Sequence, residues 1–150
     1  MPDIVLAVGL PGSGKSTWLA RAGVNPISTD AIRRQLADDE SDQTINPRVF
    51  GTVRYLLRHR IELRRPATYI DATNLTRRDR KPFLRMAREH GFRIEALWFD
   101  VPLHICKQRN AARGRVVPEH AMDLMAAKFV PPSLEEGFDR VAVVTGTEIT

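Results

Sequence analysis

The sequence has little cysteine and no spacing that suits a bound metal ion. Its 150 residues include one cysteine, Cys106, and four histidines. A single thiol cannot form a disulfide within the chain, and Cys106 has no CxxC partner that would complete a metal site. This cysteine usage fits a reducing compartment, in which the expected role of Cys106 is that of a small buried apolar side chain. We assign the histidines no chemistry.

Long hydrophobic runs are absent as well. The apolar run near the start, Ile4 to Leu10, is too short to span a bilayer. The sequence shows neither the basic leader nor the small-residue cleavage site of a signal peptide. Together with the cysteine usage, these absences predict a cytoplasmic protein. The length, with 43% hydrophobic and 27% charged residues, predicts one globular domain without repeats or linkers.

Lysine is scarce among the basic residues, because arginine supplies most of the positive charge behind the net charge of +5. The planar guanidinium group binds phosphate oxygens in bidentate pairs, whereas the lysine ammonium group acts as a point charge. An excess of arginine therefore suits a protein that recognises phosphate. Ordinary solvated helix surfaces are also rich in arginine, so the charge alone leaves open whether the partner is a polyanion.

Predicted strands and helices alternate along the chain. Short apolar segments predict strands at residues 3–9, 26–29, 67–74, 93–100 and 140–145. Amphipathic or capped segments predict helices at residues 16–21, from 30, and at 48–64, 76–90, 103–112 and 119–129. Thr76 and Asp79 form the expected capping pair of one of these helices. Such alternation predicts an α/β fold with a parallel sheet covered by helices on both faces.

The segment "GLPGSGKST", residues 9–17, joins the first predicted strand to the first predicted helix. Its glycines allow backbone N–H groups to point inward, and the helix adds the positive end of its dipole, so the loop can hold phosphate groups. We expect Lys15, at a solvent-facing position, to reach the β- and γ-phosphates and the Ser16 hydroxyl to ligate Mg²⁺. With the strand and helix pattern, this loop predicts a P-loop kinase-type fold. The residues predicted to bind ATP here are Gly9, Gly12, Ser13, Gly14, Lys15, Ser16 and Thr17.

Three further absences argue against other classes of P-loop protein. The chain has no guanine-reading NKxD segment and no LSGGQ-like transporter signature. Asp71, the best candidate for a Walker-B aspartate, is followed by Ala72 and not by the glutamate that motor ATPases usually carry. The pattern therefore favours a small kinase that transfers phosphate to an acceptor.

Four segments past the loop resemble one family of kinases. They are "STDAIR", "DATN", "WFDVP" and "RNAARGRVVPEH". They follow in the same order and at similar intervals as in the 5′-hydroxyl polynucleotide kinases, the kinase domain of phage and bacterial nucleic-acid repair enzymes. The resemblance covers nearly the whole chain. It implies a helical lid at about residues 103–117, ATP as phosphate donor with Mg²⁺, and the 5′-hydroxyl end of DNA or RNA as acceptor.

Asp30 and Arg33 are three residues apart at the start of a predicted helix, near the carboxyl end of the second predicted strand. Their side chains are therefore expected to share a face at the edge of the sheet where ligands bind. The resemblance implies that Asp30 is the catalytic base for the 5′-hydroxyl and that Arg33 binds the phosphate on the 3′ side of the acceptor nucleotide. A helix N-cap and a solvated arginine are the structural alternatives. Arg34 is expected to face elsewhere, and we do not select it.

Arg109 and Arg113 are four residues apart, on one face of a predicted helix that ends before Gly114. The resemblance implies that this segment covers the triphosphate and that both arginines bind ATP. Arg113 matches the arginine that clamps the phosphate in the family and is the third predicted catalytic residue, with Lys15 and Asp30. An ordinary basic helix surface is the alternative for both arginines. Arg115 stays without a role.

Further candidates lie at the end of the third predicted strand and on the loop at that end. Asp71 can hold Mg²⁺ through water, as a Walker-B aspartate does, or it can cap the turn to Asn74, and the sequence leaves both open. Thr73 and Arg77 are expected to line the acceptor channel on the same loop.

The sequence contains no DxDxT-type phosphatase motif. We therefore expect a free-standing kinase domain without a phosphatase or ligase domain, so that a phosphatase or ligase that acts with it would be a separate protein. The leading interpretation is a polynucleotide 5′-hydroxyl kinase. One alternative is a small-molecule kinase, such as an antibiotic phosphotransferase or a toxin-like sugar-nucleotide kinase. The other is a nucleotide-dependent binding protein without transfer activity.

Overall fold

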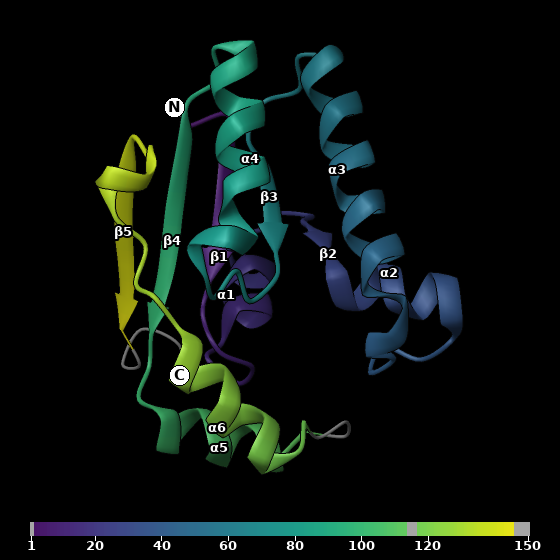
Figure 1. The fold of residues 1–150 in the computed structure, drawn as a ribbon, viewed down its shortest axis with the longest axis vertical. Helices are drawn as coiled ribbons and strands as arrows, with labels where there is room; N and C mark the ends of the chain where they lie inside the picture. The colour runs from purple at the N-terminus through teal and green to yellow at the C-terminus, as the bar shows by residue number, and fades with distance from the viewer. Residues whose placement is uncertain (1, 114–116, 146–150) are drawn as a thin grey trace.

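The computed structural model describes residues 2–113 and 117–145, and within them a five-stranded parallel sheet carries helices on both faces (Figure 1). The strands are β1 (Ile4–Val8), β2 (Ile27–Ser28), β3 (Thr68–Asp71), β4 (Ile94–Asp100) and β5 (Arg140–Thr145). Their order across the sheet is β2-β3-β1-β4-β5, and every neighbouring pair is parallel. The predicted α/β fold is confirmed.

Helices connect successive strands, as parallel pairing requires. They are α1 (Lys15–Arg21), α2 (Thr29–Ala37), α3 (Asn46–Glu62), α4 (Arg77–His90), α5 (Leu103–Ala111) and α6 (Glu119–Lys128). Two short 3₁₀ helices, η1 (Gln43–Ile45) and η2 (Leu134–Glu136), precede α3 and β5. The predicted capping pair of α4 is confirmed, because Thr76 accepts a hydrogen bond from the backbone N–H of Asp79 and the Asp79 side chain caps in return.

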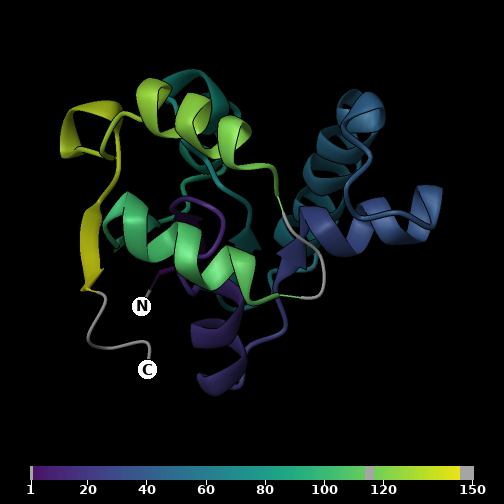
Figure 2. The same cartoon turned by 90° about the horizontal axis from the view of Figure 1, so that it is seen from below.

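The alternation of side chains along β1 divides the core into two parts. Ile4, Leu6 and Val8 point to the face that packs against α2, α3 and α4. Val5 and Ala7 point to the opposite face, where α1, α5 and α6 contribute buried side chains. Figure 2 shows α1 and α4 on opposite sides of the sheet. Cys106 belongs to the second core and is fully buried, as expected.

All strands point toward the same edge of the sheet, which lies at the bottom of Figure 1 near α5 and α6. The loop after β1, the start of α2 after β2 and the end of β3 therefore meet at this edge. In a parallel sheet, this carboxyl edge is where ligands bind. In the part of the chain that the structure describes, no helix is both long and apolar enough to cross a bilayer.

Candidate active site

The loop between β1 and α1 has the backbone conformation that its glycines allow. Gly12 and Gly14 have φ angles of 81° and 94°, in the left-handed region that favours glycine. At Gly12, an added Cβ would lie 2.4 Å from the carbonyl oxygen of Cys106, so the loop packs tightly against α5. The loop is also joined to the neighbouring strand end, because Gly9 N–H donates to the Thr73 carbonyl at 3.0 Å. Ser13 is fully buried inside the loop.

Lys15 begins α1 and is buried, with 8% of its surface exposed. The expectation of a solvent-facing position was therefore wrong. Its Nζ folds back into the loop and donates to the carbonyl oxygens of Gly9 at 2.9 Å and Leu10 at 3.0 Å. The phosphate loop wraps around its own lysine, so burial follows from the same glycine conformations that form the loop.

The surroundings of Lys15 also shift its pKa. Burial lowers the pKa of Lys15, and the nearby positive charge of Arg113 lowers it further, while Asp71 and Asp30 act in the opposite direction. Three of the groups whose charges act on Lys15 are therefore candidate site residues: the predicted catalytic residues Asp30 and Arg113, and Asp71. These four groups interact although they come from four different parts of the chain.

Ser16 and Asp71 are in direct contact. The Ser16 hydroxyl donates to Asp71 Oδ2 at 2.7 Å, and the carboxylate is buried at the end of β3. A hydroxyl and a carboxylate are the hard oxygen ligands that Mg²⁺ takes while it keeps several water molecules. The donor set of Ser16 and Asp71 therefore fits Mg²⁺.

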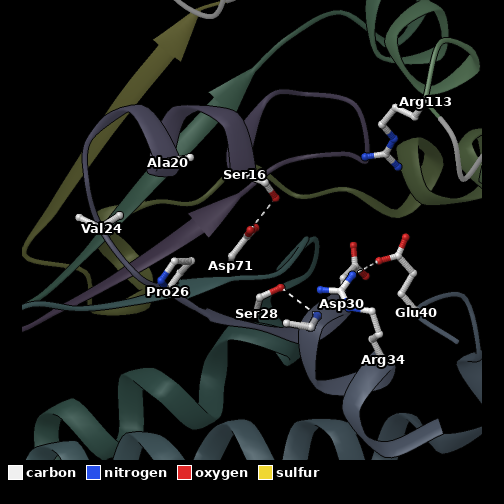
Figure 3. A pocket seen from close by; sticks show the side chains of 11 residues that line it. Ser16, Ala20, Val24, Pro26, Ser28, Asp30, Arg34, Glu40, Asp71 and Arg113 are labelled. Atoms are coloured by element: carbon white, nitrogen blue, oxygen red, sulfur yellow. Dashed lines mark hydrogen bonds and ion pairs between the residues drawn. The ribbon is translucent and has the colours of Figure 1, made fainter. Parts of the chain in front are cut away.

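A cavity of about 720 Å³ opens beside these groups. Figure 3 shows Ser16 and Asp71 at its centre, Asp30 and Arg34 beside Glu40, and Arg113 reaching in from the end of α5. The other lining residues come from α1, the segment after it and the start of α2: Ala20, Val24, Pro26, Ser28 and Ala31. The structure thus brings the predicted residues Ser16, Asp30, Asp71 and Arg113 to one cavity.

Asp30 lies in the first turn of α2, where the capping role belongs to another residue. Ser28 is the N-cap, and its side chain accepts a hydrogen bond from the backbone N–H of Ala31 at 3.2 Å. The Asp30 carboxylate pairs with Arg33, as their shared helix face predicts, at a distance of 3.1 Å from Oδ1 to Nη1. The side chain of Asp30 is 48% exposed and that of Arg33 only 7%.

Arg33 does not line the cavity. Its Nε and Nη2 both donate to Asn46 Oδ1, at 3.1 and 2.9 Å, which fixes the guanidinium group between α2 and the start of α3. Arg34 does line the cavity, so the expectation that it faces elsewhere was wrong. The signal that could have found it is its spacing from Asp30, since residues four apart share a helix face.

The two remaining acceptor candidates, Thr73 and Arg77, are not among the residues that line the cavity. The backbone of Thr73 holds the phosphate loop through the bond to Gly9, and the neighbouring Asn74 donates from Nδ2 to the Ala7 carbonyl at 2.7 Å. Arg77 turns toward η2, where it bonds Ser133 and lies 3.7 Å from Glu135.

The segment predicted as a lid is described in part. Helix α5 ends at Ala111, so Arg113 lies beyond the helix and not on the face that carries Arg109. Asn110, which is buried, bonds both the carbonyl and the N–H of Val117 at 2.7 and 3.0 Å, and so joins the two sides of the segment. Residues 114–116, including Arg115, lie outside the described residues.

A five-stranded parallel sheet with this loop after its first strand defines a P-loop kinase-type domain. The family model AAA_33, an AAA domain, matches residues 4–132, so the chain belongs to this family. The solved structure of a sugar kinase from Janibacter sp. HTCC2649 has the same fold. It is 18% identical, with a TM-score of 0.67, and the match covers 98% of this chain and 87% of that chain.

Two curated relatives are similar in sequence. The L-seryl-tRNA(Sec) kinase of Methanococcus maripaludis is 23% identical over 96% of this chain and 59% of its own length. The bifunctional polynucleotide phosphatase/kinase of Schizosaccharomyces pombe is 28% identical over 95% of this chain and 33% of its own length. The chain therefore spans less than two thirds of the length of each relative.

Proposed function

We propose that this domain is an ATP-dependent kinase that transfers the γ-phosphate of ATP to the 5′-hydroxyl end of DNA or RNA. The observation that carries the proposal is the placement of Asp30. Its half-exposed carboxylate borders the same cavity as Ser16, Asp71 and Arg113. A carboxylate at this position can accept the proton of a hydroxyl group that approaches the end of the bound triphosphate.

The phosphate donor would lie on the loop formed by residues 9–17. Lys15 would exchange its bonds to the loop carbonyls for the β- and γ-phosphate oxygens. Ser16 and Asp71 would hold Mg²⁺, which neutralises phosphate charge when it is bound. Arg113 would stabilise the charge on the γ-phosphate from the opposite side of the cavity, with Arg109 supporting the nucleotide from α5.

The transfer itself exchanges one bond for another. The 5′-oxygen forms a bond to the γ-phosphorus, the bond from that phosphorus to the β–γ bridging oxygen breaks, and ADP leaves. The hydroxyl proton passes to the Asp30 carboxylate. Holding the acceptor oxygen in line with the breaking bond supplies much of the rate enhancement, because little covalent chemistry is left to the protein.

Two further observations support a nucleic-acid acceptor. The sequence resembles the 5′-hydroxyl polynucleotide kinases in four segments, and the polynucleotide phosphatase/kinase of S. pombe is a relative. The arginine-rich chain, with a net charge of +5, suits a polyanionic partner. We further propose that the domain acts in nucleic-acid end repair in the cytoplasm, together with a phosphatase or ligase activity.

Other acceptors compete with this proposal. The seryl-tRNA kinase relative favours a seryl group carried on tRNA, which is also a hydroxyl acceptor attached to nucleic acid. A small-molecule kinase would instead use a sugar or nucleoside hydroxyl, in the same fold.

The test is transfer of label from γ-labelled ATP to matched acceptors. The panel contains 5′-hydroxyl DNA and RNA oligonucleotides, the same oligonucleotides with a 5′-phosphate, seryl-tRNA, and sugars and nucleosides. We expect label at the 5′ end of the 5′-hydroxyl oligonucleotides and none on those already phosphorylated. Label only on seryl-tRNA or only on a sugar would contradict the proposal, as would ATP binding without transfer to any acceptor.

A further inference from the structure

The excess positive charge of the chain is concentrated in one segment. Residues 46–65, which form α3 and the turn after it, contain six arginines and one glutamate. This segment therefore carries a net charge of +5, equal to that of the whole chain, and the acidic and basic residues outside it balance. Charge of one sign gathered on one element favours a polyanionic partner at that element. The arginines are Arg48, Arg54, Arg58, Arg60, Arg64 and Arg65.

Ion pairs do not neutralise these arginines within residues 2–113 and 117–145, the part of the chain that the structure describes. None of the six pairs with a carboxylate there. Arg60 donates to the Thr68 hydroxyl and to the Pro66 carbonyl, which are uncharged groups. Arg48 and Arg58 are exposed on the helix. A phosphate group can therefore pair with them without breaking an existing ion pair, and it releases counterions as it binds.

The exposed face of α3 carries an aromatic side chain among these arginines. The opposite face packs into the core through residues spaced four apart: Val49, Val53, Leu57 and Ile61. Tyr55 is 57% exposed. The ring of His59, one turn later, packs edge-on against the Tyr55 ring, with their centroids 4.4 Å apart. An exposed aromatic ring beside arginines is the arrangement on which nucleic-acid bases stack in proteins that bind single strands.

A groove lies beside Tyr55, between α3 and the end of α2. Its volume is about 310 Å³, and it is lined by Leu36, Arg48, Gly51, Thr52 and Tyr55. A Cβ added at Gly51 would meet no atom within 4 Å, so the glycine leaves open space in the groove. The lining offers an apolar wall, an aromatic ring and a guanidinium group. This combination fits a flat base and the phosphate attached to its nucleotide.

Helix α3 begins beside the acceptor side of the active-site cavity. Asn46, in its first turn, accepts hydrogen bonds from Arg33, which also contacts Asp30. Figure 1 shows α3 starting next to α2 and running away from the carboxyl edge of the sheet. The acidic residues of this region lie in the loop at 38–42, before α3, and the one acidic residue of α3 is Glu62 in its last turn. The charged face of α3 thus extends from the cavity toward the opposite end of the molecule.

We propose that the exposed face of α3 binds the body of a single-stranded nucleic acid, with a base stacked on Tyr55 in the groove and phosphates paired with Arg48 and Arg58. This surface recognises neither the 5′ end nor the base sequence, because stacking and phosphate pairing are open to every nucleotide. It is separate from the transfer site at Asp30, so a strand that cannot accept a phosphate still binds it. The inference therefore goes beyond the proposed transfer reaction.

The test measures binding of a fluorescent oligothymidylate strand that carries a 5′-phosphate, by anisotropy over a series of salt concentrations. Tyr55→Ala should raise Kd by about 5- to 150-fold, the range for one base stacked on an aromatic side chain. Tyr55→Phe keeps the ring and should bind like the wild type. Gly51→Leu should also weaken binding, because it fills the groove and leaves both the charge and the ring in place.

Salt dependence tests the arginines. Arg48→Gln and Arg58→Gln should each reduce the slope of log K against log salt by about 0.7, the value for one phosphate of a single strand. Arg140→Gln is the matched control, because its side chain is 64% exposed and lies on β5, at the edge of the sheet far from α3 (Figure 1). The slope of this control should equal that of the wild type.

The outcomes that would overturn the inference are distinct. One is a wild type that does not bind the strand, and another is wild-type affinity in Tyr55→Ala with unchanged slopes in both arginine variants. An equal loss of slope in Arg140→Gln would show that the charge acts without a defined site. Tighter binding of polyglutamate or of phosphatidylserine vesicles than of the strand would assign α3 to an acidic protein or to a membrane. Failure of transfer to 5′-hydroxyl oligonucleotides would contradict the proposed function alone, since the 5′-phosphorylated strand is not an acceptor.

Discussion

If the domain binds ATP, Lys15 exchanges its hydrogen bonds to the loop carbonyls for contacts with the phosphates. Burial lowers the pKa of Lys15, which means that the folded chain holds its ammonium group at a cost. That cost is present below the lowered pKa and disappears as the pH rises toward the ordinary lysine value, so Lys15 makes stability increase over that interval. Triphosphate binding supplies the negative charge that removes the cost.

The corresponding prediction is for Lys15→Met. Phosphate transfer should fall by about 10³ or more, since Lys15 is the one basic residue among residues 9–17, the phosphate loop. The free energy of unfolding at neutral pH should change by less than about 1 kcal/mol, because the variant loses three hydrogen bonds but no longer buries a charge. Turnover and denaturant unfolding check the two parts. An unfolded variant would show that Lys15 is required for the fold, and an active one would remove it from catalysis.

Arg113 and Arg109 provide a matched pair at the edge of the cavity. Only Arg113 lines the cavity, while Arg109 belongs to the last turn of α5. Arg113→Ala should therefore lower kcat by about 10³, as for other arginines that stabilise a transferring phosphoryl group, and Arg109→Ala should lower it less. Steady-state kinetics of the two variants measures the difference. Equal losses of kcat in the two variants would mean that the position of Arg113 in the cavity lining gives it no larger role than Arg109.

At the scale of single residues, spacing and motif chemistry predicted four residues that line the cavity, Ser16, Asp30, Asp71 and Arg113. They could not predict that Lys15 is buried, because that depends on the path of its own loop. Nor could they show that Arg34 lines the cavity and that Arg33 is buried. The burial of Arg33 results from Asn46, thirteen residues later, and nothing in the local pattern of α2 reveals that contact.

Secondary-structure elements were more predictable than individual contacts. Strand positions followed from short apolar runs, and the α4 boundaries followed from the Thr76 cap and Gly91, where φ is 67°. Helix α5 ends at Ala111, one residue before the predicted end at 112, and it does not continue to Arg113, which was expected on the same helix face as Arg109. Contacts between distant elements had no local signal at all.

The clearest such contact is the buried pair of Arg80 and Glu136, which joins α4 to η2. Arg80 is fully buried, donates to both carboxylate oxygens at 2.8 and 3.0 Å, and also bonds the carbonyls of Asn74 and Val130. The pair therefore fixes the segment before β5 against the loop that follows the candidate Mg²⁺ residue, Asp71. Its two members are 56 residues apart in the chain.

Glu136→Ala should lower the free energy of unfolding by about 3–5 kcal/mol, because it leaves the charge of Arg80 buried without its carboxylate partner. Glu135→Ala is the adjacent control. Its side chain is 86% exposed and 3.7 Å from Arg77, so the expected change is within about 0.5 kcal/mol. Denaturant unfolding of both variants gives the comparison. A Glu136→Ala variant as stable as its control would mean that the buried pair contributes no net stability.

At the scale of the whole molecule, the net charge of +5 suits a polyanionic acceptor, and the salt dependence of KM distinguishes a polymeric acceptor from a small one. Each phosphate of a single strand that the protein neutralises releases counterions, and log K then falls with log salt by about 0.7 per phosphate. A nucleoside 3′-monophosphate offers one such contact and an oligonucleotide offers several. At saturating ATP, the acceptor KM should therefore rise more steeply with salt for a 5′-hydroxyl decanucleotide than for the mononucleotide.

The difference between the two slopes, divided by about 0.7, gives the number of additional phosphates that the surface neutralises. A neutral sugar acceptor provides the control, because its KM should hardly respond to salt once ATP is saturating. We expect a difference that corresponds to at least one further phosphate. Equal slopes for the decanucleotide and the mononucleotide would confine recognition to the terminal nucleotide at Asp30. A flat response for both would contradict a polyanionic acceptor, since a cation-lined site cannot bind a nucleic acid strand without releasing its counterions.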